Sequence, residues 1–189
     1  MRNKGELLEE AKWGKLTPEE LAYVVQKIQS SKPGDDEDLY TWIHILGRSG
    51  NRQYRKLVEG FLYYPSNPII SRIALNTLCN YWSFARDYLK ELKTFIKGVD
   101  WDEDQDVRDI AVSCAGAFLK EEEEKELLKL IIGIVEKFIN AEEDSHDAIM
   151  WEGAYTALSR AMGKEWKDIL SAKEIDLPMI EKAKQRLEN

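Results

Sequence analysis

The residues most able to support acid–base or nucleophilic chemistry are few and lie far apart in the sequence. There are two histidines, His44 and His146, and no HExxH, GxSxG or P-loop pattern occurs around either of them. Catalysis requires several reactive groups that converge on one point. We therefore expect a protein without enzyme activity, and we assign no catalytic residue and no cofactor.

The aspartates from Asp100 to Asp106 have the 1, 3, 5, 7 spacing of an EF-hand calcium loop. Gln105, however, stands where that loop requires glycine, and Ala111 stands where it requires a bidentate glutamate. The pattern therefore does not predict a calcium site. The two cysteines, Cys79 and Cys114, have no CxxC or Cys/His cluster around them, so no metal ligand is assigned.

Basic residues are concentrated in the middle of the chain, where the segment from Arg48 to Lys97 has nine basic and three acidic residues. The cations that we assign to a partner-binding surface are Arg52, Arg55, Lys56, Arg86, Lys90, Lys93 and Lys97. The last four follow an i, i+4, i+7, i+11 spacing, which places them on one stripe of a helix. This basic stripe is either an ordinary solvated face or a docking patch for an acidic protein surface or a phosphate.

Acidic residues dominate the next segment, from Asp100 to Asp147, which has sixteen acidic and five basic residues. Carboxylates near a helix N-terminus stabilise the helix by ~0.3–1 kcal/mol each, so helix capping is one interpretation. The other is that carboxylates imitate phosphate in front of a basic partner. The carboxylates assigned to such a partner are Asp102, Asp104, Glu121 and Glu124.

Composition limits the class of protein further. The net charge is −8, which disfavours general coating of nucleic acid or of an anionic membrane. Residues 1–10 contain no apolar leader, and no stretch reaches the ~18 consecutive apolar residues of a membrane span. We therefore expect a cytoplasmic protein, and a length of 189 residues favours a single domain.

Prolines and glycines divide the chain into helix-length segments, and none of them alternates with a period of two. Helix starts are marked by Thr17-Pro18-Glu19-Glu20 and by Asn67-Pro68. The expected class is all-α. The expected helices are 5–13, 18–30, 37–48, 52–63, 68–81, 84–97, 105–119, 122–139, 146–162, 164–171 and 178–188.

Four of these helices align with one another. Their first core position is occupied by Trp42, Ala74, Ala111 and Ala154, at spacings of 32, 37 and 43 residues. One turn later stand Leu46, Leu78, Ala115 and Leu158, followed by the small residues Gly47, Cys79, Gly116 and Ser159. Small residues allow close helix crossings, and spacings of this size are typical of stacked helical pairs, so an α solenoid is predicted.

The segment from Val107 to Gly116 resembles the first helix of HEAT repeats, which reads roughly V-R-x-x-A-A-x-A-L-G, and 70–79 is the next best copy. The resemblance covers residues 37–171 and implies a right-handed superhelix of about four helical pairs. It implies one domain over 1–189, with an N-terminal cap over 1–36 and a C-terminal cap over 172–189.

The resemblance also suggests a function. HEAT-like solenoids bind other proteins on extended curved surfaces, and short acidic members resemble bacterial immunity proteins, which neutralise a toxin by direct binding. A non-enzymatic protein-binding module is therefore expected, with a basic toxin domain as a candidate partner and no membrane. The alternative is a HEAT-like DNA glycosylase that excises alkylated bases, suggested by Trp101-Asp102, although the surrounding negative charge disfavours nucleic acid.

Overall fold

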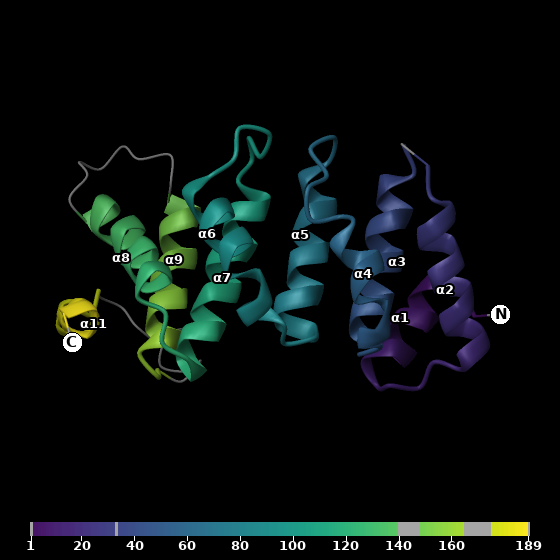
Figure 1. The fold of residues 1–189 in the computed structure, drawn as a ribbon, viewed down its shortest axis with the longest axis horizontal. Helices are drawn as coiled ribbons and strands as arrows, with labels where there is room; N and C mark the ends of the chain where they lie inside the picture. Colours follow the sequence, from purple (N-terminus) through teal and green to yellow (C-terminus); the bar gives the residue numbers. More distant parts are fainter. Residues whose placement is uncertain (1, 33, 140–147, 165–174, 189) are drawn as a thin grey trace. The chain divides into compact units, whose positions relative to one another are not determined.

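A computed structural model describes residues 2–32, 34–139, 148–164 and 175–188 (Figure 1). Every regular element in these residues is a helix, and no strand occurs among them. The expected all-α class is therefore confirmed for the described residues. The helices form two compact units, residues 1–84 (unit 1) and 85–189 (unit 2). The single solenoid domain with terminal caps stays a prediction.

Unit 1 is arranged around α3 (Asp36–Arg48). This helix packs against α1 (Lys4–Lys12), α2 (Pro18–Ser30) and α5 (Pro68–Asn76), while α4 (Arg55–Glu59) is short. The start of α2 agrees with its sequence signal, because the Thr17 side chain accepts from the Glu20 backbone and Glu20 accepts from the Thr17 backbone.

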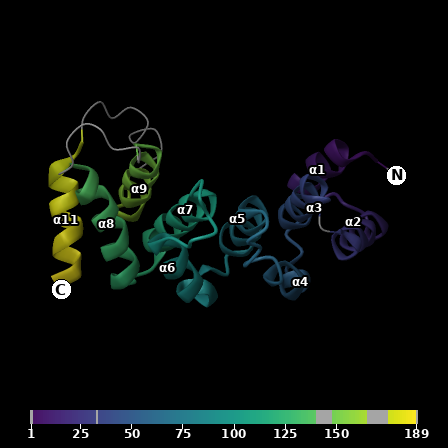
Figure 2. The ribbon, with the colours of Figure 1, turned by 90° about the horizontal axis from the view of Figure 1, so that it is seen from above.

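Unit 2 contains α6 (Leu89–Lys97), α7 (Asp106–Glu121), α8 (Lys125–Ile139), α9 (Ala148–Ala161) and α11 (Leu177–Glu188). The most extensive packing is that of α7 on α9, and α6 and α8 each pack on α7. Figure 2 shows α6 beside α7 and α8 between α9 and α11. This arrangement leaves a face of α8 next to the end of α6 and the start of α9.

The predicted repeat register agrees with the burial pattern, since the core positions and the small positions that follow them are all buried. Two glycines explain why small residues are needed. A Cβ on Gly116 of α7 would lie 2.6 Å from the Ala157 Cα of α9. A Cβ on Gly47 of α3 would lie 2.5 Å from the Thr77 Oγ1. Each glycine therefore marks a close helix contact within its own unit.

Several expected helix boundaries need correction. The helix expected over 52–63 consists of a 3-10 turn, Arg52–Tyr54, followed by α4, and it ends at Glu59 because Gly60 and the approach to Pro65 do not continue it. The segment 68–81 finishes as a π-helical turn over Thr77–Tyr81. The start of 84–97 is 3-10 over Ala85–Tyr88.

The remaining differences lie in unit 2. The helix expected from residue 122 begins at Lys125, because the Glu122 backbone is extended. The helix expected over 146–162 is α9, Ala148–Ala161, and residues 146 and 147 lie outside the described residues. Of the helix expected over 164–171, only Lys164 is described.

Candidate functional site

The basic residues assigned to partner binding in unit 1 are engaged within that unit. The Arg52 and Arg55 guanidinium groups lie over the Phe84 ring, 5.5 Å and 4.7 Å from its centroid. Arg55 also donates to Glu59 at 2.8 Å, and Lys56 reaches the other oxygen of Glu59 at 2.7 Å. These cations thus already have a carboxylate or a ring as a neighbour.

The basic stripe of α6 meets the acidic residues that precede and open α8. Lys93 lies 2.9 Å from Glu124 and 2.7 Å from Glu126, and Lys97 lies 3.4 Å from Glu126. The hydrogen bonds that Lys93 donates to Glu126 and, to a smaller extent, to Glu124 raise the pKa of Lys93, and the bond from Lys93 lowers the pKa of Glu126. Part of the basic stripe and part of the acidic segment, which the sequence presents as alternative binding surfaces, therefore form ion pairs with each other.

The other two members of the basic stripe, Arg86 and Lys90, differ in whether they have a carboxylate partner. Arg86 forms an ion pair with Glu122, in the same acidic run. Lys90 is exposed and has no carboxylate within 4.0 Å among the described residues. Glu121, at the end of α7, is also exposed.

Asp102 is a helix-capping residue. It is 6% exposed, and its Oδ2 accepts from the backbone N–H groups of Val107 and Arg108, both at 3.0 Å. These are donors of the first turn of α7, which lack partners within the helix. Asp104 is exposed nearby. Of the two interpretations of these acidic residues, helix capping is the one that the contacts of Asp102 support.

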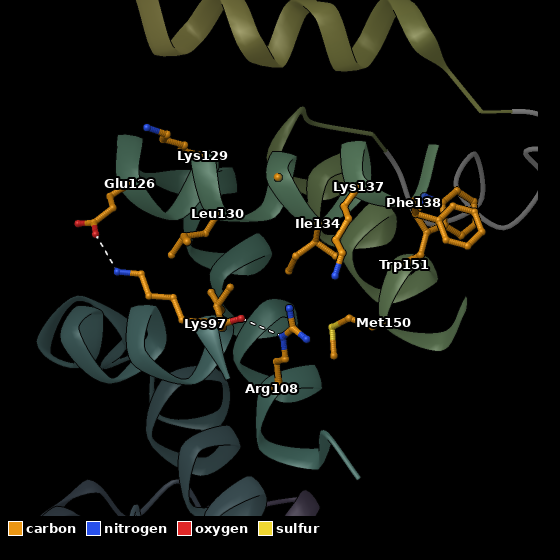
Figure 3. A pocket seen from close by; sticks show the side chains of 12 residues that line it. Lys97, Arg108, Glu126, Lys129, Leu130, Ile134, Lys137, Phe138, Met150 and Trp151 are labelled. Atoms are coloured by element: carbon orange, nitrogen blue, oxygen red, sulfur yellow. Dashed lines mark hydrogen bonds and ion pairs between the residues drawn. The ribbon is translucent and has the colours of Figure 1, made fainter. Parts of the chain in front are cut away.

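A groove runs along one face of α8, with a volume of about 530 Å³ (Figure 3). We call it the α8 groove. It is lined from α8 by Glu126, Lys129, Leu130, Gly133, Ile134, Lys137 and Phe138. It is completed by Ile96 and Lys97 of α6, Arg108 of α7, and Met150 and Trp151 of α9. The α8 residues recur at i+3 and i+4, so they form a single stripe about 18 Å long.

The interior of the α8 groove is apolar. Figure 3 shows Leu130, Ile134 and Met150 around its centre, with Phe138 and Trp151 together at one end. The Phe138 and Trp151 rings stack with centroids 4.6 Å apart, and Tyr155 stacks on Trp151 at 5.5 Å. The Trp151 Nε1 is shielded from solvent and has no hydrogen-bond acceptor among the described residues.

The edge of the groove is mostly cationic. Lys97 and Glu126 form an ion pair at one end. Arg108 is anchored by its Nε, which donates to the Ile96 carbonyl at 2.9 Å, and by one Nη, which donates to Gln105 at 2.8 Å. In Figure 3 the Arg108 guanidinium and the Lys137 ammonium point toward the same space. Within the described residues, no carboxylate lies within 4.0 Å of Lys137 or of Lys129.

The histidines, cysteines and possible metal ligands of the described residues do not form a second candidate site. The His44 Nε2 accepts from Arg48 at 3.3 Å, and burial, then Arg48 and Lys12, lower the pKa of this histidine. His146 lies outside the described residues. Among the residues that the structure describes, no three His, Cys, Asp or Glu gather as a metal site, and Cys79 and Cys114 are buried and belong to no disulfide. No described helix is long and apolar enough to cross a membrane.

Sequence reasoning singled out only one lining residue of the α8 groove, Lys97, as partner-binding. A signal was present in α8, whose buried residues Leu127, Leu128, Ile131, Ile132 and Val135 already supply a full core face. Leu130, Ile134 and Phe138 form a second apolar stripe on the same helix. One apolar face is enough to bury an amphipathic helix, so the second stripe indicates a further apolar contact surface.

Comparison with family models, with curated proteins and with solved structures finds no match to this chain.

Proposed function

We propose that this chain is a non-enzymatic protein-binding module of HEAT-like helical repeats, and that its partner occupies the α8 groove. The observation that carries the proposal is the second apolar stripe of α8, Leu130, Ile134 and Phe138, which lines an open groove in place of a closed core. Apolar patches that are rimmed by polar groups are typical of interaction sites.

The structure of the acidic segment bears on the two narrower hypotheses. The DNA glycosylase alternative would use the Asp102 carboxylate, and this group is buried as the cap of α7. The immunity hypothesis would use carboxylates against a basic toxin domain. Glu124 is held by Lys93, which leaves Asp104 and Glu121 as the exposed members of that set. The α8 groove therefore offers the more complete binding surface.

Photo-crosslinking can locate the partner-binding surface. Benzoylphenylalanine would replace Ile134 in the groove, Lys90 on the basic stripe, or Asp104 on the acidic surface, and each variant would be irradiated in an extract of the source cells. We expect a discrete protein adduct from position 134 and none from the two control positions. An adduct from position 90 or 104 alone, or from no position, would contradict the proposal.

A further inference from the structure

The charges around the α8 groove favour one class of partner. This inference rests on the proposed function and goes beyond it. Its apolar centre is bordered by Lys129, Lys137, Arg108 and Lys97, and of these only Lys97 is paired with a groove carboxylate, Glu126. Arg108 and Lys137 face one space, and among the described residues no carboxylate lies within 4.0 Å of Lys137, so the two like charges repel each other. The electrostatic energy of the groove is therefore lower when an anion lies between these cations.

Two of these cations are positioned for that anion. Arg108 is held in place by hydrogen bonds to the Ile96 carbonyl and to Gln105, so its planar donors are fixed beside the groove. Lys137 extends from α8 toward the same space (Figure 3). A guanidinium and an ammonium that face one space provide charge-assisted hydrogen bonds to a carboxylate.

The shape of the groove indicates the size of the occupant. The lining stripe extends over three turns of α8, from Glu126 to Phe138, and it is exposed at its middle, Gly133. A Cβ built on Gly133 meets no atom within 4 Å, so the space above the helix is open. An elongated open groove suits a helical peptide segment, which lays apolar side chains at i, i+3, i+4 and i+7 into such a surface.

We propose that the α8 groove binds an acidic amphipathic helix of a partner protein. Apolar side chains of that helix contact Leu130 and Ile134, and one carboxylate lies between Arg108 and Lys137. A second carboxylate meets Lys129. Lys129 and Lys137 are eight residues apart on α8, about 12 Å along its axis, so the partner carries its acidic residues about two turns apart.

The test is a selection of displayed 16-residue helical peptides with randomised surface positions, carried out on the full chain. We expect enriched peptides with net negative charge and an i, i+3/i+4, i+7 apolar pattern. The substitution Lys137→Glu should weaken their binding roughly tenfold or more. The matched control Lys90→Glu makes the same charge change on α6, outside the groove, and should leave the affinity unchanged.

The outcomes separate this inference from the proposed function. Enriched peptides that lose binding in Lys137→Glu but carry no acidic bias would overturn the acidic helix and leave a protein-binding groove. Peptides insensitive to Lys137→Glu, or no enrichment at all, would overturn the inference. A parallel titration with dodecanoate, followed by tryptophan fluorescence, identifies a small amphipathic anion. Groove-dependent binding of dodecanoate without any peptide would also overturn the proposal.

Discussion

Two basic side chains of unit 2 have surroundings that differ from those of the paired arginines in unit 1. In unit 1, Arg52 and Arg55 lie over an aromatic ring, and Arg48 lies 4.4 Å from the centroid of the Tyr81 ring. In unit 2, Lys129 and Lys137 border an apolar groove, and no carboxylate of the described residues lies within 4.0 Å of either ammonium. A cation that already has a partner contributes to the fold. One that borders the half-buried apolar side chains of a groove is available for recognition.

The largest effect is expected at the close helix contacts. Gly116→Ala places a methyl group against the backbone of Ala157, which cannot move away, and should lower the free energy of unfolding by about 2–3 kcal/mol. Gly47→Ala meets the side chains of Thr77 and Tyr81, which can adjust, and should lower it by about 1 kcal/mol. Alanine has the same propensity advantage in both helices, so the difference reports packing.

Urea unfolding followed by circular dichroism measures this pair of variants. An equal loss in both, or a larger loss in Gly47→Ala, would contradict the close approach of α7 and α9.

The next effect concerns the acidic segment. Asp102→Ala removes the acceptor of two backbone N–H groups of α7 and should lower the free energy of unfolding by about 1–2 kcal/mol. Asp104→Ala, at an exposed position, should change it by under about 0.5 kcal/mol. Thermal melts of the two variants make the comparison, and a larger effect at Asp104 would count against helix capping.

A smaller effect should distinguish two lysines of unit 2. Lys93→Gln removes an ammonium that bridges Glu124 and Glu126, so the melting temperature should fall. The loss should shrink at 1 M salt, where the Debye length is about 3 Å. Lys137→Gln removes a cation that faces Arg108, so the melting temperature should hold or rise. A fall in Lys137→Gln as large as that in Lys93→Gln would show that Lys137 has a stabilising partner.

The smallest effect is a pH dependence in unit 1. The pKa of His44 is lowered in the folded chain, so below its unfolded value, about 6.5, the unfolded state binds more protons. The stability contributed by neutral His44 is present above pH 6.5 and is lost as the pH falls. His44→Gln should flatten this part of the stability profile, measured by urea unfolding at pH 7.5 and pH 5.5. Identical pH profiles for the variant and the wild type would contradict His44 as the source of this pH dependence of stability.

The sequence predicts the register of the helices better than the groove. The positions of Ala111, Ala115 and Gly116 follow from spacing within one helix, and their burial agrees with that spacing. The α8 groove depends on which helices meet. Arg108 belongs to α7 and Met150 to α9, and sequence spacing alone does not bring them beside Leu130 of α8. The pairing of Lys93 with Glu124 likewise joins two segments that only the fold brings together, so sequence spacing does not predict it.

The most direct test of the α8 groove is to fill it without weakening the helix. Gly133→Ala and Gly133→Leu both replace a helical glycine where a Cβ has open space, so both should be at least as stable as the wild type. Only leucine extends far enough to occupy the groove.

The decisive measurement is the affinity of the two variants for the partner crosslinked from position 134, made beside their urea unfolding curves. We predict that Gly133→Ala binds like the wild type and that Gly133→Leu binds at least about tenfold more weakly while remaining folded. Equal affinity in the two variants, with both folded, would contradict a partner bound in the α8 groove.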